Sequence, residues 1–197
     1  MQRIELAEVN RIRGRIARAH ALAADRFRAA FEAQPDWRLH LEIQAAALLE
    51  MADGVRLREG DRIAYRIDGR TITPYIVEGR PPWPYLIVGR TPAAILEYWL
   101  IAAELAAWAM TKLIADGAEY DAALARMQQP QLVRALIASF LPEVELRDDG
   151  TALLEVTVYT RADEERVERR LLVLEQDNEF RFHSRELIAE GRGGVRV

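Results

Sequence analysis

The first 33 residues carry an apolar stripe that predicts a single, unusually long helix. Its members recur at spacings of three and four residues: Val9, Ile12, Ile16, Ala19, Ala23, Phe27 and Ala30/Phe31. A helix over 3–33, ended by Pro35, would be about 45 Å long. A compact domain of 197 residues has a radius of gyration of only about 16 Å. The helix is therefore expected to lie across the body of the protein or to project from it.

The small residues of this stripe favour close contact between helices. Ala19, Ala23 and Ala30 would let a second helix approach closely, which predicts a homodimer or a contact with another protein. A second helix over 37–52, begun by the N-cap Asp36, could instead fold back and cover the stripe within one chain. Both arrangements are compatible with the sequence.

The remaining pattern predicts an α+β fold. The segment 37–52 is rich in helix formers, although its alternating apolar residues would also suit a strand. The pattern then switches to a period of two, which predicts a small antiparallel β-meander with a hairpin turn at Asp68-Gly69. The expected later elements are a helix over 92–115 begun by Thr91-Pro92, shorter helices near 118–128 and 130–140, and a C-terminal three-stranded antiparallel meander formed by 152–160, 166–175 and 179–187.

This order of elements suggests a simple domain organisation. Residues 1–35 form the long amphipathic helix, packed on or projecting from the body, and 36–190 form a single α+β domain. The glycine-rich end, 191–197, is expected to be a loose tail.

Three successive units of ten residues stand out within the first strand region. They open at Tyr65, Tyr75 and Tyr85, and each has a Gly-Arg pair at the same place. The face opposite the tyrosines becomes more apolar from the first unit to the third. The strand over 85–89 is therefore predicted to be central and buried on both faces.

Two arginines of these units are candidates for binding an anion. If the second and third strands are neighbours, Arg70 and Arg90 lie on adjacent strand ends, where like charges are unfavourable unless an anion lies between them. Arg90 also precedes the start of helix 92–115, which attracts anions. The simpler alternative is that Asp68 and Glu97 already neutralise both arginines.

Trp83 is the third candidate ligand-binding residue. It lies in the proline-rich loop "RPPWP", where an exposed indole would serve recognition and an inward-facing one would cover the core. Together with Arg70 and Arg90 it predicts a pocket for a small anionic ligand between the sheet and helix 92–115.

No motif predicts a metal site or a cofactor. The chain has no cysteine, and the spacing of its three histidines, His20, His40 and His183, fits no common metal-binding motif. We therefore expect neither metal ligands nor a bound cofactor.

No motif predicts catalytic residues either. Glu97 and Glu104, two helical turns apart, could serve acid–base chemistry, but a solvent-facing stripe is the simpler account. Lys112, the only lysine, falls in the last turn of helix 92–115, where a cation complements the helix dipole.

Charge and hydropathy favour a soluble, cytoplasmic protein of bacterial type without a membrane segment. The N-terminus lacks the apolar core of a signal peptide, and Glu97 and Glu104 interrupt the most apolar stretch. Seven arginines against four acidic residues give 1–35 a charge of +3, and seven against fourteen give 143–190 a charge of −7. This uneven distribution favours a protein partner over nucleic acid.

Three function classes follow from these observations. The sequence most favours a non-catalytic interaction or assembly protein that uses its amphipathic helices. A domain that binds a small anionic ligand near Arg70, Arg90 and Trp83 is the alternative. An enzyme using carboxylates or arginines is the second alternative.

Overall fold

The structure is a computed structural model that describes residues 1–30, 37–69, 71–76, 79–106, 111–133, 138–161 and 165–192. Within these residues the fold is α+β, as predicted, with the helices α1 (Leu6–Ala30), α2 (Trp37–Met51), α3 (Pro92–Leu105) and α4 (Gly117–Arg126). The chain divides into two compact units. Unit 1 comprises Met1–Val9, Ala109–Gln176 and Phe180–Val197, and unit 2 comprises Asn10–Trp108 and Asp177–Glu179. Compactness does not test independent folding, so the single domain expected over 36–190 stays a prediction.

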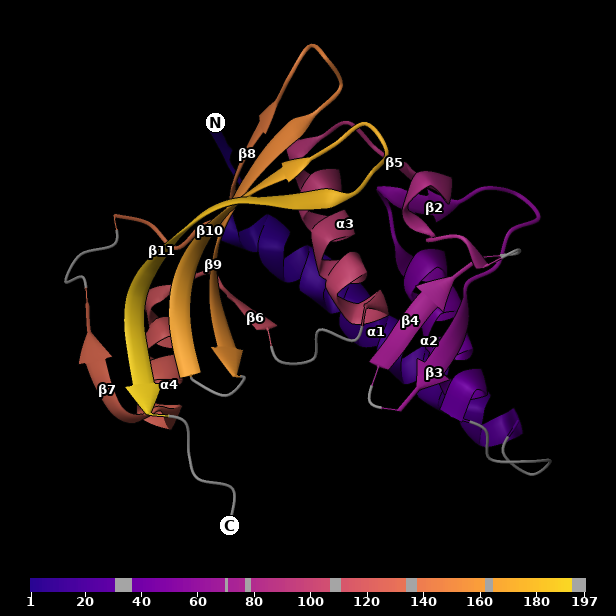
Figure 1. Cartoon of the computed structure of the whole chain (residues 1–197), viewed down its shortest axis with the longest axis horizontal. Coiled ribbons are helices and arrows are strands. Elements are labelled where there is room, and N and C mark those ends of the chain that lie inside the picture. Colours follow the sequence, from indigo (N-terminus) through magenta and orange to yellow (C-terminus); the bar gives the residue numbers. More distant parts are fainter. Residues whose placement is uncertain are drawn as a thin grey trace. The chain divides into compact units, whose positions relative to one another are not determined.

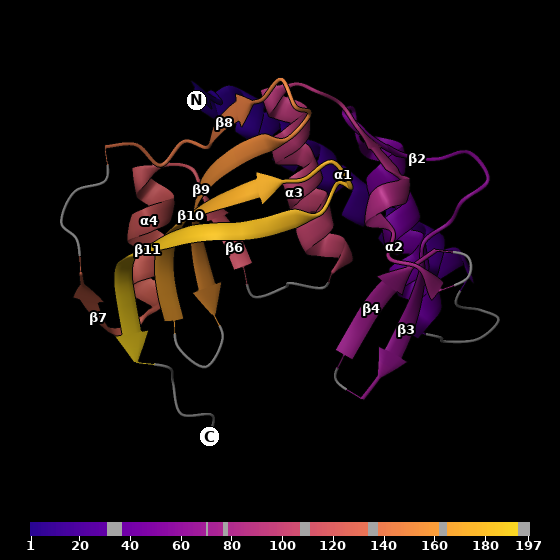
Figure 2. The same ribbon diagram turned by 45° about the horizontal axis from the view of Figure 1, so that its top comes forward.

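Unit 1 is built on an antiparallel sheet. Its seven described strands follow the order β1-β8-β9-β10-β11-β7, and β6 also pairs with β9. Their bounds are β1 (Gln2–Arg3), β6 (Thr111–Ile114), β7 (Gln128–Leu132), β8 (Glu143–Leu146), β9 (Ala152–Arg161), β10 (Glu165–Leu174) and β11 (Phe180–Arg192). Figures 1 and 2 show β9, β10 and β11 side by side and strongly curved. These three strands are the predicted C-terminal meander, and β11 continues into Gly191 and Arg192, which were expected in the tail.

Helix α4 packs against one face of this sheet. The buried cluster there contains Ile114, Ala123, Met127, Tyr159, Val167, Ile188 and Ala189. The helix begins at this point because the Asp116 carboxylate accepts a hydrogen bond from the amide of Glu119 at 2.8 Å. The Glu119 carboxylate in turn accepts from the amide of Ala115 at 2.8 Å. The first bond satisfies an amide that the first helical turn leaves without a partner, and the second ties Ala115, the residue before the N-cap, to the same turn.

Two segments predicted to be helical contain strands instead. The helix expected over 92–115 ends at Leu105, and β6 pairs with β9, so Lys112 lies on a strand and not in a last helical turn. The helix expected over 130–140 is wrong at its start, because β7 pairs there with β11. Residues 134–137 lie outside the described residues. At both places pairing with a long neighbouring strand outweighs the local helix propensity.

Unit 2 combines helices with two small ribbons. The strands β3 (Ala64–Asp68) and β4 (Thr71–Tyr75) form the predicted hairpin, but its turn is one residue later than expected, because Asp68 belongs to β3 and pairs with Thr71. Gly69 has a positive φ, 58°, which suits a tight hairpin turn. The strands β2 (Val55–Leu57) and β5 (Leu86–Val88) form the second ribbon. Figure 2 shows the β3–β4 hairpin beside α2.

The chain itself covers much of the apolar stripe of α1: Val9, Ile12, Ala19 and Ala23 are buried, and Ile16, Phe27 and Ala30 are half-buried. Ala19 and Ala23 are at most 2% exposed, so neither alanine can receive a second chain. Arg26 of α1 pairs with Glu50 of α2 at 2.7 Å. Helix α2 thus folds back on α1, which is the intrachain arrangement that the sequence left open.

The prediction that the strand over 85–89 is central and buried on both faces is wrong. Among the described residues β5 pairs only with β2, and β4 pairs only with β3. Leu86 is 2% exposed whereas Ile87 is 41% exposed, so one face of β5 is buried and not both. A short 3-10 helix over Trp83–Tyr85 leaves only three residues for the strand. The repeated units therefore belong to two separate ribbons.

Gly54 lies where the β2–β5 ribbon meets α3. Its carbonyl accepts a hydrogen bond from the amide of Gly89 at 2.7 Å. A Cβ atom at Gly54 would lie 2.4 Å from the Cβ and 2.8 Å from the Cα of Ala94. Because one of these atoms is backbone, even an alanine side chain would require the ribbon or the helix to move.

We predict that Gly54→Ala lowers the free energy of unfolding by about 1–3 kcal/mol through this overlap with α3. Gly117→Ala is the matched control, because nothing lies within 4 Å of its added Cβ. Denaturant unfolding of the two variants measures the difference. Equal stability of both variants would contradict the close approach.

Candidate functional site

The charged groups of unit 2 centre on a buried carboxylate, Glu97 of α3, which is 1% exposed. One of its oxygens accepts a hydrogen bond from Arg15 Nε at 2.7 Å. The other accepts from the amides of Asp53 and Gly54 at 3.1 and 2.7 Å. Arg15 also pairs with the Asp53 carboxylate at 3.3 Å. These contacts join α1, α3 and the segment between α2 and β2, so they act as a structural anchor.

The solvent-facing stripe predicted for Glu97 and Glu104 is therefore wrong for Glu97. No local pattern indicates that Arg15, 82 positions away, supplies its counter-ion. Glu104 is about half exposed and pairs with His20 of α1 at 3.5 Å. Since each carboxylate has its own partner on α1, the two do not form a paired acid–base site.

The contact between His20 and Glu104 makes one interaction pH-dependent. The hydrogen bond to Glu104 raises the pKa of His20 above its ordinary value of 6.5, and partial burial opposes this shift. The protonated imidazole is therefore favoured in the folded protein.

The residues predicted to bind an anion are not assembled as the sequence argument required. Arg70 lies outside the described residues, and Arg90 is exposed beside Thr91, the N-cap of α3. Trp83 is half-buried in its 3-10 turn. Among the described residues β4 and β5 do not pair, so the adjacent strand ends expected for this site are not formed. Anion binding by these three residues stays a prediction.

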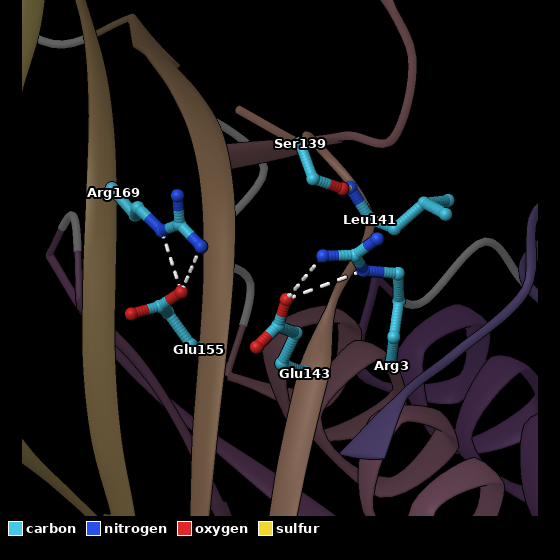
Figure 3. A network of polar contacts seen from close by, with 6 residues as sticks. All are labelled: Arg3, Ser139, Leu141, Glu143, Glu155 and Arg169. Carbon is cyan, nitrogen blue, oxygen red and sulfur yellow. Dashed lines mark hydrogen bonds and ion pairs between the residues drawn. The ribbon is translucent and has the colours of Figure 1, made fainter. Parts of the chain in front are cut away.

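A second polar cluster lies on the sheet of unit 1 (Figure 3). Arg3 of β1 donates to Glu143 of β8 at 3.2 Å, and Arg169 of β10 donates through Nε to Glu155 of β9 at 2.6 Å. Glu143 and Glu155 are direct partners in the β8–β9 pairing. Two carboxylates at that position repel each other unless each is neutralised. The two arginines do this, Arg169 from a diagonal position on β10. The cluster therefore stabilises the sheet, and each carboxylate is engaged by an arginine.

Unit 2 has a surface groove along α2. Its volume is about 400 Å³, and we call it the α2 groove. It is lined by Leu39, Glu42, Ile43, Ala46, Leu49, Leu57, Asp61, Arg62 and Ile63. The apolar residues of α2 in this list recur at the spacing of one helix face, which is the pattern that packs against another helix. The groove is the strongest candidate for a functional surface.

The sequence held a signal for this groove. The helix α2 buries Ala45, Ala47 and Leu48, while Leu39 and Ile43 lie on a separate apolar face that lines the groove. A helix that is apolar on two faces needs two partners. Residues 37–52 were compatible with either a helix or a strand. Because the two structures place the apolar residues on different faces, the sequence alone did not identify this second face.

Comparison with models of protein families, with curated proteins and with solved structures found no match to this chain. Within the described residues, no group of three or more side chains could hold a metal ion. None of the described helices is both long and apolar enough to cross a membrane.

We predict that Glu97→Gln lowers the free energy of unfolding by about 3 kcal/mol, because it removes the buried carboxylate and leaves Arg15 with only the exposed Asp53 as a counter-ion. Glu104→Gln on the same helix is the control, and we expect a cost of at most about 1 kcal/mol for an exposed pair. Denaturant unfolding near neutral pH measures both. Equal effects would show that Glu97 is not an anchor.

We predict a pH dependence from His20. A raised pKa in the folded state adds stability that is fully present below the unfolded-state pKa of about 6.5 and is lost as the pH rises through the folded-state pKa. The stability difference between the wild type and His20→Gln should therefore be larger at about pH 5 than at about pH 9. Urea unfolding at the two pH values measures it, and a constant difference would exclude the contribution.

Proposed function

We propose that the protein is a non-catalytic assembly protein that forms a homodimer through the α2 groove. The occupant of each groove is the α2 face of a second copy. The observation that carries this proposal is the row of apolar side chains Leu39, Ile43, Ala46 and Leu49 along the groove. Their spacing of four, three and three residues is that of a helix–helix seam. At about 1.5 Å per residue the row is about 15 Å long, which matches a helix of three turns.

The shape of the row supports pairing with itself. In an antiparallel two-fold pair of α2 helices, Leu39 of one copy faces Leu49 of the other. Ile43 then faces Ala46, so a large side chain enters the space above a small one. A two-fold interface requires such self-complementarity, because the same patch serves both copies.

The charges at the edge of the groove support the same occupant. Glu42, Asp61 and Arg62 line it, and none of the three has an ion pair with another described residue. Because both signs line the groove, Arg62 of one copy can pair with an acid of the other. A purely basic partner would leave Arg62 of the groove without a counter-charge, and a purely acidic partner would leave its two acids without one.

The enzyme alternative has less support. The partly or fully buried carboxylates of Glu97, Glu143 and Glu155 are each engaged by an arginine. A group that acts as general acid or base must be able to exchange its proton with a substrate.

We predict that Ala46→Arg converts the dimer to a monomer. Ala46 is exposed in the single chain, so the arginine is tolerated by the fold but places a charge in the centre of the apolar seam. Ala24→Arg is the matched control, because Ala24 is an exposed alanine of α1 that does not line the groove. Light scattering coupled to gel filtration gives the masses.

The expected masses are about twice 22.4 kDa for the wild type and the control, and 22.4 kDa for Ala46→Arg. A wild-type monomer throughout the micromolar range would refute the proposal. A dimer that survives Ala46→Arg would also refute it, since the interface would then lie elsewhere.

A further inference from the structure

Unit 1 contains a pocket of about 250 Å³ that plays no part in the proposed dimer. It lies between β6, β9 and α4. Lys112 of β6 is the direct pairing partner of Tyr159 of β9. Paired residues of neighbouring strands share a face, so both lie on the side of the sheet that α4 covers.

The wall formed by α4 explains why a pocket exists there. Ala118, Ala122 and Arg126 line it and follow one another at spacings of four residues, so they occupy one face of the helix. The two alanines leave a space that larger side chains would fill. The hydroxyl of Tyr159 donates to Glu165 at 2.8 Å, which leaves the ring itself to line the space.

The charges in this pocket are unevenly engaged. Asp116 and Glu119 accept the backbone hydrogen bonds that begin α4. Lys112 and Arg126 line the same pocket and are exposed. Within the described part of the chain, neither of these side chains forms an ion pair or a hydrogen bond. Among the described residues, the two cationic groups of the pocket thus have no ion pair, while each of its two acids is oriented by a backbone hydrogen bond at the start of α4.

We propose that this pocket binds a small organic anion with a single ring. Lys112 and Arg126 hold the acidic group, and Tyr159 and the alanines of α4 contact the ring. The size is adequate, because a dry cavity of about 150 Å³ accepts benzene. A carboxylate and a phosphate share the required charge, and the experiment below separates them. The proposal does not depend on the homodimer.

The test is calorimetric titration of the whole protein with benzoate, phenyl phosphate, inorganic phosphate and benzamide. We expect saturable binding of at least one aryl anion, and the tighter of the two identifies the acidic group. Benzamide, the uncharged analogue of benzoate, should not bind, and inorganic phosphate should bind more weakly than phenyl phosphate. No saturable binding of either aryl anion, or equal binding of benzamide, would overturn the proposal.

Variants locate the binding in this pocket. Lys112→Met and Arg126→Met should each weaken the aryl anion by about tenfold, because each removes a charged hydrogen-bond donor. Ala122→Trp should abolish binding by filling the space. Ala125→Trp, an exposed alanine of α4 outside the pocket, is its matched control. Unchanged affinity in both charge variants would overturn the assignment, even if Ala122→Trp failed to fold.

The single lysine allows a direct check of contact. An amine-reactive reagent can modify only Lys112 and the N-terminal amine in this chain. A saturating aryl anion should slow modification of Lys112 and leave that of the N-terminus unchanged, as read by mass spectrometry. Equal rates at Lys112 with and without the anion would overturn its role.

Discussion

The arrangement of unit 2 depends on one buried carboxylate. Glu97 receives a guanidinium from α1 and two amides from the segment between α2 and β2, so three elements are positioned by one side chain. A buried charge is costly unless all its hydrogen bonds are made. This requirement restricts how α1, α3 and the end of α2 can lie within the unit. The outer face of α2, which forms the proposed dimer surface, is held in place by the same contacts.

Local signals in the sequence predicted those elements that local interactions specify. The apolar spacing of α1, the Thr91-Pro92 start of α3 and the β3–β4 hairpin each depend on neighbouring residues. The structure contains all three, with the hairpin turn one residue later than predicted. The C-terminal strands were recognisable for the same reason, since their alternation and turns lie within one continuous stretch. The residues at turns and helix caps were therefore the main basis for predicting the α+β class.

The errors arose where distant residues decide the structure. Nothing close to Thr111–Ile114 indicates that β9 will recruit it as a strand, and nothing close to Glu97 indicates Arg15. The candidate pocket was missed for a related reason. The sequence pattern places Lys112 at a helix end, so it does not predict the position of Lys112 opposite Tyr159 on the sheet. The α2 groove was visible in part, because Leu39, Ile43, Ala46 and Leu49 already have helical spacing in the sequence.

Amide hydrogen exchange tests the role of Glu97 most directly. Asp53 and Gly54 lie between α2 and β2, outside any helix or strand, so their amides would exchange rapidly without a fixed acceptor. If Glu97 anchors unit 2, both amides should exchange as slowly as those in the centre of α3, through the same cooperative opening. Exchange of Asp53 and Gly54 as fast as that of Gly60 in an exposed turn would contradict the account.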